Sequence, residues 1–423
     1  MKKRRSWIVA LTALFGAILH AQDIAGDWQG TLKAGASEFR FIAKIAKGDD
    51  GAWKATVYSP DQGGFEQGIT VDSVTLQGSN LKLVVGALRG AYEGKISADG
   101  ASIAGAFSSQ QGPPLPLELQ RATPDTAWKD LSPHTTYFVT VDKDVKLQVL
   151  DWGGSGRPVV LLTGLGDTAH QFDRFAPKLT GAYHVYGITR RGFGTSSAPA
   201  PTSANYSADR LGDDVLAAID SLKLNRPVLV GHSLSGEELS SVGSRHPERV
   251  AGLIYLDAGY SYAYYDRSRG DLRIDVNELH RKLEQLQLMP QDPNPLIREL
   301  LETSLPALER DLRERPPAAS TQPQPVVPPI EVAVLAGMQK YTDIRVPILA
   351  IYALPHDQGL ADPAARAAAD AKDLETTGVQ AKAFETGLPS ARVVRLPHAG
   401  HYVFQTNEAD VLREMNAFIG SLP

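Results

Sequence analysis

From about residue 137 onward, short runs of Val, Ile and Leu alternate with stretches of helical periodicity, and this constrains the fold most. Several runs are continuously apolar, which is typical of strands covered on both faces. Helices are predicted at 208–224 and 408–419. The alternation predicts an α/β fold with a mainly parallel sheet and crossover helices, opened by a hairpin of the first two strands. The predicted strands are "TYFVTVD", "VKLQVLDWG", "RPVVLLTG", "AYHVYGIT", "RPVLVGH", "VAGLIYLDA", "VPILAIYAL" and "ARVVRLPH".

One interval breaks this rhythm. About ninety residues separate the run that ends near Asp257 from the run that begins near Val346, far more than a single crossover needs. Within it, Val276, Leu279 and Leu283 recur at helical spacing. The interval predicts a helical cap, inserted at about 259–341 over the edge of the sheet.

Residues 23–121 have a different pattern, with short strands separated by turn signals at 48–51, 78–80 and 98–100. Leu81 and Leu83 alternate with polar residues, as in a strand with one buried face. The pattern predicts a small antiparallel β-domain, a barrel or a sandwich, connected by a linker at 122–136. Because no His, Asp and Glu cluster in it suggests catalysis, it is predicted to be an accessory domain.

The first residues, 1–21, have the pattern of a signal peptide. Basic residues at 2–5 precede an apolar core at 7–19 that is short for a membrane span. We expect an exported protein, periplasmic or secreted, without a stable membrane span unless the signal remains uncleaved. The absence of cysteine suits an oxidising compartment. The net charge of −5, with basic residues scattered beyond the N-terminus, argues against nucleic-acid binding.

The segment "LVGHSLSGEELSS" at 229–241 places a serine, Ser233, between a predicted strand and a predicted helix. A nucleophilic serine on such a turn is held in a strained backbone conformation that tolerates only small neighbours. Gly231 and Ser235 are both small, and Gly236 adds room. The segment predicts that Ser233 is a nucleophile; the alternative is a Gly/Ser-rich helix cap.

A serine nucleophile needs a base and an acid that orients it. His398 and His401 both follow the last predicted strand and both qualify as the base. They could instead be a metal pair, but no third ligand lies at useful spacing, so no metal is predicted. Asp357, a few residues beyond a strand and between serine and histidine in chain order, is the predicted acid. Asp257, at the end of "LIYLD", is the alternative.

The tetrahedral intermediate of acyl transfer needs preorganised N–H donors. The glycine turn in "LLTGLGDTAHQF" follows a buried strand, and the residue after the nucleophile begins a helix. The predicted oxyanion-hole donors are therefore the backbone N–H groups of Leu165 and Leu234. Tyr260 and Tyr262, just after a strand, are expected either to line the substrate pocket or simply to pack.

Five segments together resemble the α/β-hydrolase family over residues 137–423. They are Gly231–Gly236, Thr163–Gly166, "RRGFGTSSAP" at 190–199, "VPILAIYALPHD" at 346–357 and Ala399–His401. The resemblance implies an eight-stranded, mainly parallel sheet, a Ser–His–acid mechanism without a cofactor, His401 as base and a cap that shapes the pocket. Relatives commonly have histidine at the position of Thr163, aspartate at Thr189 and glycine at Ser235. Serine rather than aspartate at position 233 disfavours the dehalogenase and epoxide-hydrolase branches.

The predicted function is an exported serine hydrolase that cleaves a small or medium carboxylic ester through an acyl-enzyme. An aminopeptidase, an amidase or a lactonase would use the same machinery. A catalytically inactive hydrolase fold that only binds is an alternative of another class. A nicotinamide-dependent oxidoreductase is another, because the glycines at 164 and 166 with Ala169 match a dinucleotide fingerprint. That alternative leaves Ser233 and the terminal histidines unexplained.

Overall fold

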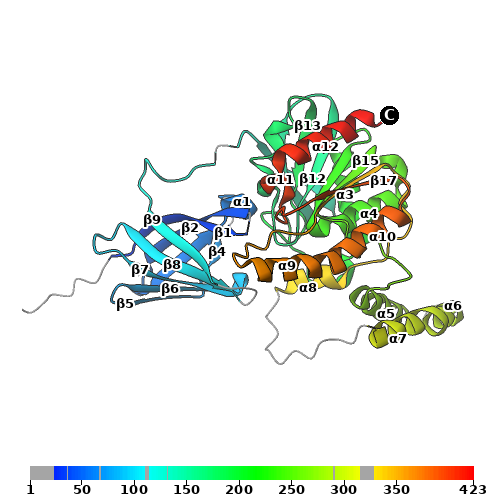
Figure 1. Ribbon diagram of the computed structural model, residues 1–423, viewed down its shortest axis with the longest axis horizontal. Coiled ribbons are helices and arrows are strands. Elements are labelled where there is room, and N and C mark those ends of the chain that lie inside the picture. Colours follow the sequence, from blue (N-terminus) through cyan, green and yellow to red (C-terminus); the bar gives the residue numbers. More distant parts are fainter. Residues whose placement is uncertain are drawn as a thin grey trace, which may run out of the picture.

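The computed structural model describes residues 23–35, 37–65, 68–109, 114–130, 132–288, 291–314 and 328–423. Two β-sheets organise these residues, one in the N-terminal part and one in the larger remainder (Figure 1). The predicted signal peptide at 1–21 lies outside the described residues. Within the described ranges, no helix has both the length and the apolar character needed to cross a membrane.

The N-terminal part is an antiparallel sheet in the order β4-β3-β2-β1-β9-β8-β7-β6-β5. Its two ends approach each other, because Val71 N–H donates to Ala55 O of β3 near one edge and Asp72 N–H donates to Val84 O of β6 near the other. The sheet therefore curls around a core that contains Trp28 and Tyr92. The predicted antiparallel β-domain is confirmed. Its strands are β1 Gly26–Ala34, β2 Ser37–Lys47, β3 Trp53–Tyr58, β4 Ile69–Thr70, β5 Ser73–Gln77, β6 Asn80–Val85, β7 Gly90–Ile96, β8 Ser102–Ser109 and β9 Leu115–Arg121.

The larger part is built on an eight-stranded sheet in the order β10-β11-β13-β12-β14-β15-β16-β17. β10 and β11 form the predicted hairpin, β11 pairs antiparallel with β13, and the remaining pairs are parallel. The mainly parallel sheet is thus confirmed. Its strands are β10 Thr135–Asp142, β11 Val145–Gly153, β12 Arg157–Leu162, β13 Tyr183–Ile188, β14 Val228–His232, β15 Gly252–Leu256, β16 Ile348–Ala353 and β17 Ala391–Leu396.

Helices cover both faces of this sheet. On one face, α3 (Ala208–Ser221), α4 (Gly236–Arg245) and α10 (Val379–Gly387) pack against the strands. On the other face, α11 (Val403–Thr406), α12 (Glu408–Ser421) and the 3₁₀ turn η2 (Ala169–Phe172) do so. The predicted helices at 208–224 and 408–419 correspond to α3 and α12. The continuous apolar strand runs follow from this double coverage.

The interval between β15 and β16 is helical, as the leucine spacing predicts. Figure 1 shows α5, α6 and α7 projecting from the body, whereas α8 lies close to it. The helices are α5 Leu272–Gln287, α6 Asn294–Glu299, α7 Leu305–Glu314 and α8 Pro329–Ala336, with a π-helical turn at Leu300–Ser304. Two further helices, α2 (Ser203–Tyr206) and α9 (Pro363–Asp373), lie outside this interval.

The two parts meet through α1 (Pro60–Gly63), a short helix of the N-terminal domain. The carbonyl of Gln62 accepts hydrogen bonds from the N–H of Thr168 (2.9 Å) and from its hydroxyl (2.8 Å). Asp61 beside it is buried and bonded by the backbone N–H and guanidinium of Arg40, which fixes α1 to β2. The N-terminal domain is therefore anchored on the loop that follows β12.

Candidate active site

Ser233 lies on the turn between β14 and α4, and its backbone has the left-handed conformation, with φ of +53°. A non-glycine residue adopts this conformation only where its surroundings impose it. The Ser235 hydroxyl donates to His232 O (2.8 Å) and Leu162 O (3.2 Å), which ties the turn to β12 and β14. A Cβ on Gly236 would lie 2.1 Å from Ala258 O. The close approach that requires glycine thus falls at position 236, one place later than the usual motif.

His401 pairs with Asp257. Nδ1 of His401 lies 2.6 Å from Oδ2 of Asp257, which is fully buried and directly follows β15. Asp257 also accepts hydrogen bonds from Ala353 N–H (3.0 Å) and the Tyr260 hydroxyl (3.0 Å). Burial by itself would raise the pKa of Asp257, but hydrogen bonds from His356 and His401 outweigh it and hold this pKa below its usual value. The carboxylate is therefore ionised, as the orienting acid of a triad must be.

Asp357, the predicted acid, is not the carboxylate that His401 contacts. Asp357 lies four residues beyond the end of β16, and its carboxylate turns back to accept the N–H of Gly359 (2.8 Å). Asp257, the alternative, directly follows its strand and turns inward with φ of +46°. Because β15 and β16 are parallel neighbours, both residues end strands at the same edge. The direction of the side chain decides between them.

His398, the alternative base, lies on the surface. Its side chain is exposed, and with His356 and Asp357 it lines a cavity of about 210 Å³ that does not include Ser233. His401, in contrast, is bonded to the buried carboxylate, and its ring lies tilted against that of His232 at a centroid distance of 4.7 Å. The structure therefore separates the two histidines and brings His401 to the turn that carries Ser233.

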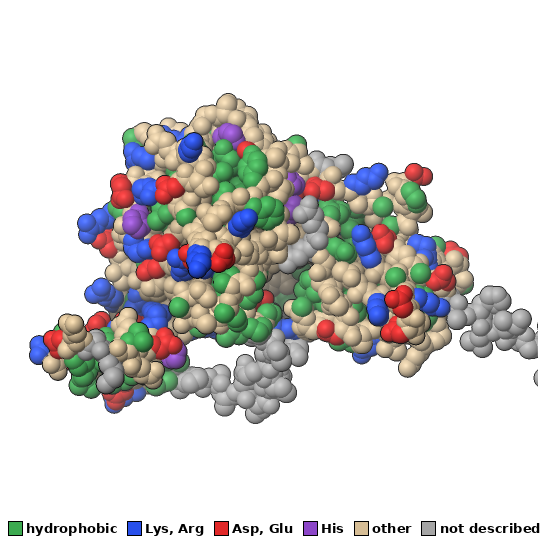
Figure 2. Space-filling view, turned by 180° about the vertical axis from the view of Figure 1, so that it is seen from behind, with side chains coloured by type: hydrophobic (Ala, Val, Ile, Leu, Met, Phe, Trp, Pro, Cys, Tyr) green, Lys and Arg blue, Asp and Glu red, His purple; other side chains and the backbone are tan. Residues whose placement is uncertain are grey.

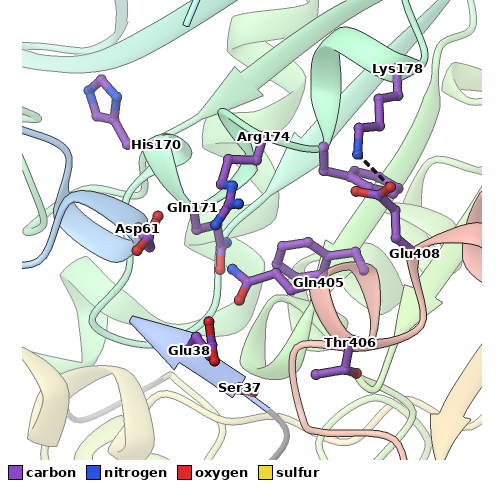
Figure 3. A pocket seen from close by; sticks show the side chains of 12 residues that line it. Ser37, Glu38, Asp61, His170, Gln171, Arg174, Lys178, Gln405, Thr406 and Glu408 are labelled. Carbon is purple, nitrogen blue, oxygen red and sulfur yellow. Dashed lines mark hydrogen bonds and ion pairs between the residues drawn. The ribbon is translucent and has the colours of Figure 1, made fainter. Parts of the chain in front are cut away.

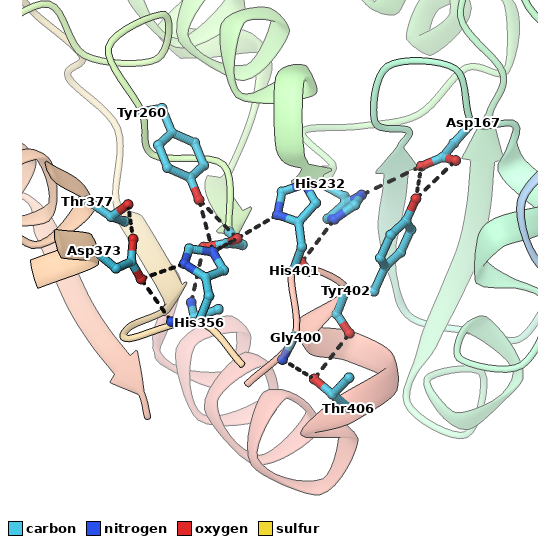
Figure 4. A network of polar contacts seen from close by, with 12 residues as sticks. Asp167, His232, Tyr260, His356, Asp373, Thr377, Gly400, His401, Tyr402 and Thr406 are labelled. Atoms are coloured by element: carbon cyan, nitrogen blue, oxygen red, sulfur yellow. Dashed lines mark hydrogen bonds and ion pairs between the residues drawn. The ribbon is translucent and has the colours of Figure 1, made fainter. Parts of the chain in front are cut away.

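A second histidine that the sequence analysis missed contacts the same carboxylate. Nε2 of His356 lies 2.8 Å from Oδ2 of Asp257, and its Nδ1 lies 2.8 Å from Asp373 (Figure 4). Burial would lower the pKa of His356, but the two carboxylates raise it to about 9. His356 is therefore a cation at neutral pH. The sequence could have indicated this residue, because His356 directly precedes the candidate acid Asp357 in the loop "LPHDQG".

The predicted oxyanion donors lie around the serine. Leu165 and Leu234 both line a cavity together with Ser233. A Cβ on Gly164 would lie 3.3 Å from Cβ of Ser233, so the glycine turn passes close to the nucleophile. This is the placement required of a turn whose N–H group is to meet the oxyanion, since donors must reach the atom that forms beside the serine.

A buried arginine holds the glycine turn. The guanidinium of Arg190 donates to Thr163 O (2.9 Å) and Gly164 O (3.0 Å) and pairs with the buried Glu238. Thr189, where relatives commonly have aspartate, accepts the N–H of Ala169 (2.9 Å). Thr163 stands where relatives commonly have histidine. The turn is nevertheless supported, through its backbone carbonyls rather than through a histidine side chain.

His232 and Tyr402 flank His401. Nε2 of His232 donates to the backbone carbonyl of His401 (3.1 Å), and burial, with a further effect of His401, lowers the pKa of His232 to about 3. The Tyr402 hydroxyl donates to Asp167 (3.1 Å; Figure 4). The same hydroxyl accepts from Nε2 of Gln62 (3.1 Å). Burial raises the pKa of Asp167 to about 7. The N-terminal domain thus reaches the neighbours of the active site through Gln62.

The cavity at Ser233 has a volume of about 530 Å³ and is formed by the sheet edge and the inserted helices. Tyr260 and Tyr262 line it as expected. Burial raises the pKa of both tyrosines well above the usual value, so their hydroxyls are neutral. The lining residues are Leu165, Ser233, Leu234, Tyr260, Ser261, Tyr262, Asp271, Leu272, Arg273, Leu335 and Met338.

Among the described residues, two groups have ligand atoms near enough to share a metal ion. One comprises Asp257, His356 and His401, and the other comprises Asp130, His134, His170 and Asp173. In the first group the carboxylate already accepts from both histidines, and in the second Asp173 already pairs with both His134 (3.2 Å) and His170 (2.8 Å). In each group a carboxylate is thus already paired with two histidines, and His398 belongs to neither group.

The dinucleotide alternative requires a helix that opens directly on the glycines. After β12 the chain instead forms a loop with Gly166 at φ of +86°, followed by the four-residue 3₁₀ turn η2. The carbonyls of this loop face Arg190, and its N-terminal domain contact is made by Thr168. The loop therefore lacks the helix N-terminus that would bind a pyrophosphate.

A polar crevice of about 330 Å³ lies elsewhere along the contact between the two domains (Figure 3). Basic side chains, Arg174 and Lys178, and acidic ones, Glu38, Asp61 and Glu408, line it together. Asp61 is paired with Arg40, and Lys178 is paired with Glu408. Ser233 and His401 do not line this crevice, so it is distinct from the catalytic cavity.

Comparison with known proteins agrees with this geometry. The profile of the Alpha/beta hydrolase family matches residues 159–414. Fluoroacetate dehalogenase of a Burkholderia species is 35% identical over 116 residues, which cover 27% of this chain and 38% of the relative. Epoxide hydrolase A of Mycobacterium tuberculosis is 34% identical over 114 residues, covering 26% and 35%.

A third relative, 2-hydroxymuconate semialdehyde hydrolase of a Pseudomonas species, is 31% identical over 113 residues, which cover 26% of this chain and 39% of the relative. The matched segments therefore span less than half the length of each of these three curated relatives.

Proposed function

Because this chain belongs to the α/β-hydrolase family, we propose that it is a serine hydrolase that cleaves carboxylic esters through an acyl-enzyme. Ser233 is the nucleophile, His401 the general base and Asp257 the orienting acid. The backbone N–H groups of Leu165 and Leu234 form the oxyanion hole. The substrate is a small or medium ester bound in the cavity that Tyr260 and Tyr262 line.

One observation carries the proposal. Ser233 has a strained left-handed backbone, and the imidazole of His401 at the same edge of the sheet is bonded through Nδ1 to a buried, ionised carboxylate. That bond fixes the tautomer and leaves Nε2 to receive the serine proton. A serine that only capped a helix would need neither the strain nor the imidazole–carboxylate pair.

In the acylation step, Oγ of Ser233 attacks the ester carbonyl carbon while Nε2 of His401 takes the hydroxyl proton. The carbonyl oxygen becomes an oxyanion that accepts the two leucine N–H groups. Collapse of this intermediate breaks the bond to the alcohol, which leaves with the proton from His401. Water then attacks the acyl-enzyme with His401 again as base, releasing the acid and restoring Ser233.

The relatives named above act on other bonds, and the nucleophile argues for an ester here. Position 233 carries a hydroxyl, which forms an ester with an acyl group that water can cleave by the same route. An amide would require His401 to protonate a poorer leaving group, and a lactone would keep the alcohol attached to the acyl-enzyme. Both are alternatives on the same machinery.

The test is a panel of p-nitrophenyl esters, anilides and lactones with the wild type, Ser233→Ala and His401→Ala. We expect ester hydrolysis by the wild type and a loss of at least about 10³-fold in each variant. A fluorophosphonate probe should label the wild type and not Ser233→Ala. Labelling and turnover that survive Ser233→Ala would refute the nucleophile, and an absence of both in the wild type would favour a binding protein.

We further propose that the protein is exported to the periplasm or secreted. The charged and apolar pattern of residues 1–21 and the lack of cysteine support this location. The test is N-terminal sequencing of the protein recovered from the periplasm and medium of a bacterium that expresses the full chain. Retention of all of the chain in the cytoplasm would contradict the proposal.

A further inference from the structure

A second, apolar cavity lies between the N-terminal domain and the hydrolase domain. Its volume is about 460 Å³, within the range of small-molecule sites. The N-terminal domain contributes Phe41 and Phe107, whose buried rings belong to its core, and Leu88, which is 38% exposed. The hydrolase domain contributes Phe193 and Ile330. Figure 2 shows hydrophobic side chains on both sides of the hollow where the two domains meet.

This cavity adjoins the catalytic site at two places. Leu165, the proposed oxyanion donor, lines both this cavity and the cavity at Ser233. Tyr402, the neighbour of His401, also lines it, and its ring contacts that of Phe39 edge-on at a centroid distance of 5.2 Å. Leu165 and Tyr402 therefore place this cavity directly beside the cavity at Ser233 and the loop that carries His401.

The charged residues on its wall are already neutralised. Arg40 pairs with Asp61 (2.8 Å), Glu331 pairs with Arg89 (3.3 Å), and Asp167 accepts hydrogen bonds from Tyr402 and Gln62. Ser59 and Gln62, which also line the cavity, are hydrogen-bonded to each other (2.9 Å). Apart from these polar residues and three glycines, the lining is aromatic and aliphatic. An uncharged hydrocarbon group gains most from such a site, since each buried methylene contributes about 0.8 kcal/mol.

From this adjacency we infer that the interdomain cavity binds a hydrocarbon portion of the ester substrate, either the acyl chain or the alcohol chain. The inference rests on the proposed function. The N-terminal domain then forms one wall of the substrate site and selects for longer apolar esters. Its anchoring through Gln62 to Thr168 keeps that wall in register with the oxyanion turn.

The kinetic test compares chain lengths in two series. The acyl series is p-nitrophenyl acetate and octanoate, and the alcohol series is methyl acetate and octyl acetate, followed by acid release. Leu88→Asp places a charge in the cavity, and Ala87→Trp, at a lining residue, narrows it. We expect the long-to-short ratio of kcat/KM to fall at least about tenfold in one series for both variants. The series that responds identifies the bound portion.

The matched control is Leu374→Asp, since Leu374 is 50% exposed and lies outside both cavities. Its long-to-short ratio should equal that of the wild type. Thermal unfolding of every variant distinguishes a local effect from loss of folding. Unchanged ratios in both series for folded Leu88→Asp and Ala87→Trp would overturn the inference, and so would an equal fall in the Leu374→Asp control.

A binding arm needs no turnover and separates this inference from the proposed function. N-phenyl-1-naphthylamine, an uncharged probe that fluoresces in apolar sites, should bind the Ser233→Ala protein. The increase in its fluorescence should be lost in the double variant that combines Ser233→Ala with Leu88→Asp. It should be kept in the double variant that combines Ser233→Ala with Leu374→Asp. Equal probe binding in the two double variants would overturn the cavity assignment, even if the wild type hydrolyses esters. Loss confined to Leu88→Asp would support it, even if the wild type hydrolyses none of them.

Discussion

Oδ2 of Asp257 lies 2.6 Å from Nδ1 of His401, although 144 residues of chain separate them. The same carboxylate accepts from His356, Tyr260 and the N–H of Ala353. A fully buried carboxylate is costly unless hydrogen bonds and charges compensate for its lost hydration. Here the compensation comes from two imidazoles, so that one of them can be held for catalysis while the other supplies positive charge.

Asp257→Asn should lower kcat for ester hydrolysis by about 10³- to 10⁴-fold, because the amide cannot hold the required tautomer of His401. Asp357→Asn is the matched control and should change kcat less than about threefold, since its carboxylate accepts only a local N–H bond. The measurement is steady-state hydrolysis of p-nitrophenyl acetate by folded variants. The reverse order of the two losses would restore Asp357 as the acid.

His356→Gln should destabilise the protein in a pH-dependent manner. The pKa of His356 is raised from 6.5 to about 9, so protonation is favoured in the folded state. Its stabilising contribution is fully present below about pH 6.5 and is lost as the pH rises through about 9. Urea unfolding at about pH 6, 8 and 10 should show that the difference in free energy of unfolding between the wild type and His356→Gln becomes smaller as the pH rises. His280→Gln, on the exposed surface of α5, should show no such trend. A deficit that is constant with pH would contradict the expected charge of His356.

Arg190→Lys should lower kcat about 10- to 100-fold with a smaller effect on KM. An ammonium group cannot hold Thr163 O, Gly164 O and Glu238 together in the way the guanidinium fork does. The turn that presents the N–H of Leu165 would then lose its position. Arg174→Lys, an exposed residue of the polar crevice, is the control and should keep the wild-type kcat. Equal kcat in both variants would show that the contacts of Arg190 with the glycine turn and Glu238 are not needed for activity.

Gly236→Ala should destabilise the folded state by about 1–3 kcal/mol, because its Cβ would meet the backbone carbonyl of Ala258. Ser235→Ala should cost only about 1 kcal/mol, through the lost hydroxyl bond to His232 O. Urea unfolding measures both. Gly181→Ala is the control, since no atom lies within 4 Å of its Cβ, and it should not destabilise. If Ser235→Ala cost more than Gly236→Ala, the assignment of the steric requirement to position 236 would fail.

The turn at Ser233 and the succession of strands along the chain were predictable because their signals are local. A strand, a cluster of small residues and a helix follow one another in "PVLVGHSLSGEEL", and that succession produces the turn wherever the domain folds. The same holds for the apolar strand runs and for the short strands of the N-terminal sheet. Each of these features is specified by side chains within a few residues of one another.

The carboxylate that pairs with His401 was not predictable in this way. Asp257 and Asp357 follow neighbouring parallel strands, and chain order alone favours Asp357. His356 was overlooked although it directly precedes Asp357, because a histidine gains its role from the carboxylates that surround it. Here those are Asp257 and Asp373, which lie 99 and 17 residues away along the chain.

The sequence by itself determined the two kinds of sheet, the strained serine turn and the set of side chains available for catalysis, because periodicity and small residues act over short range. Only the tertiary structure decided which carboxylate faces His401, and that Gln62 of the N-terminal domain contacts Tyr402 beside it. Such choices depend on side-chain direction at a shared sheet edge and on the docking of two domains. Both are set by packing between residues distant in sequence.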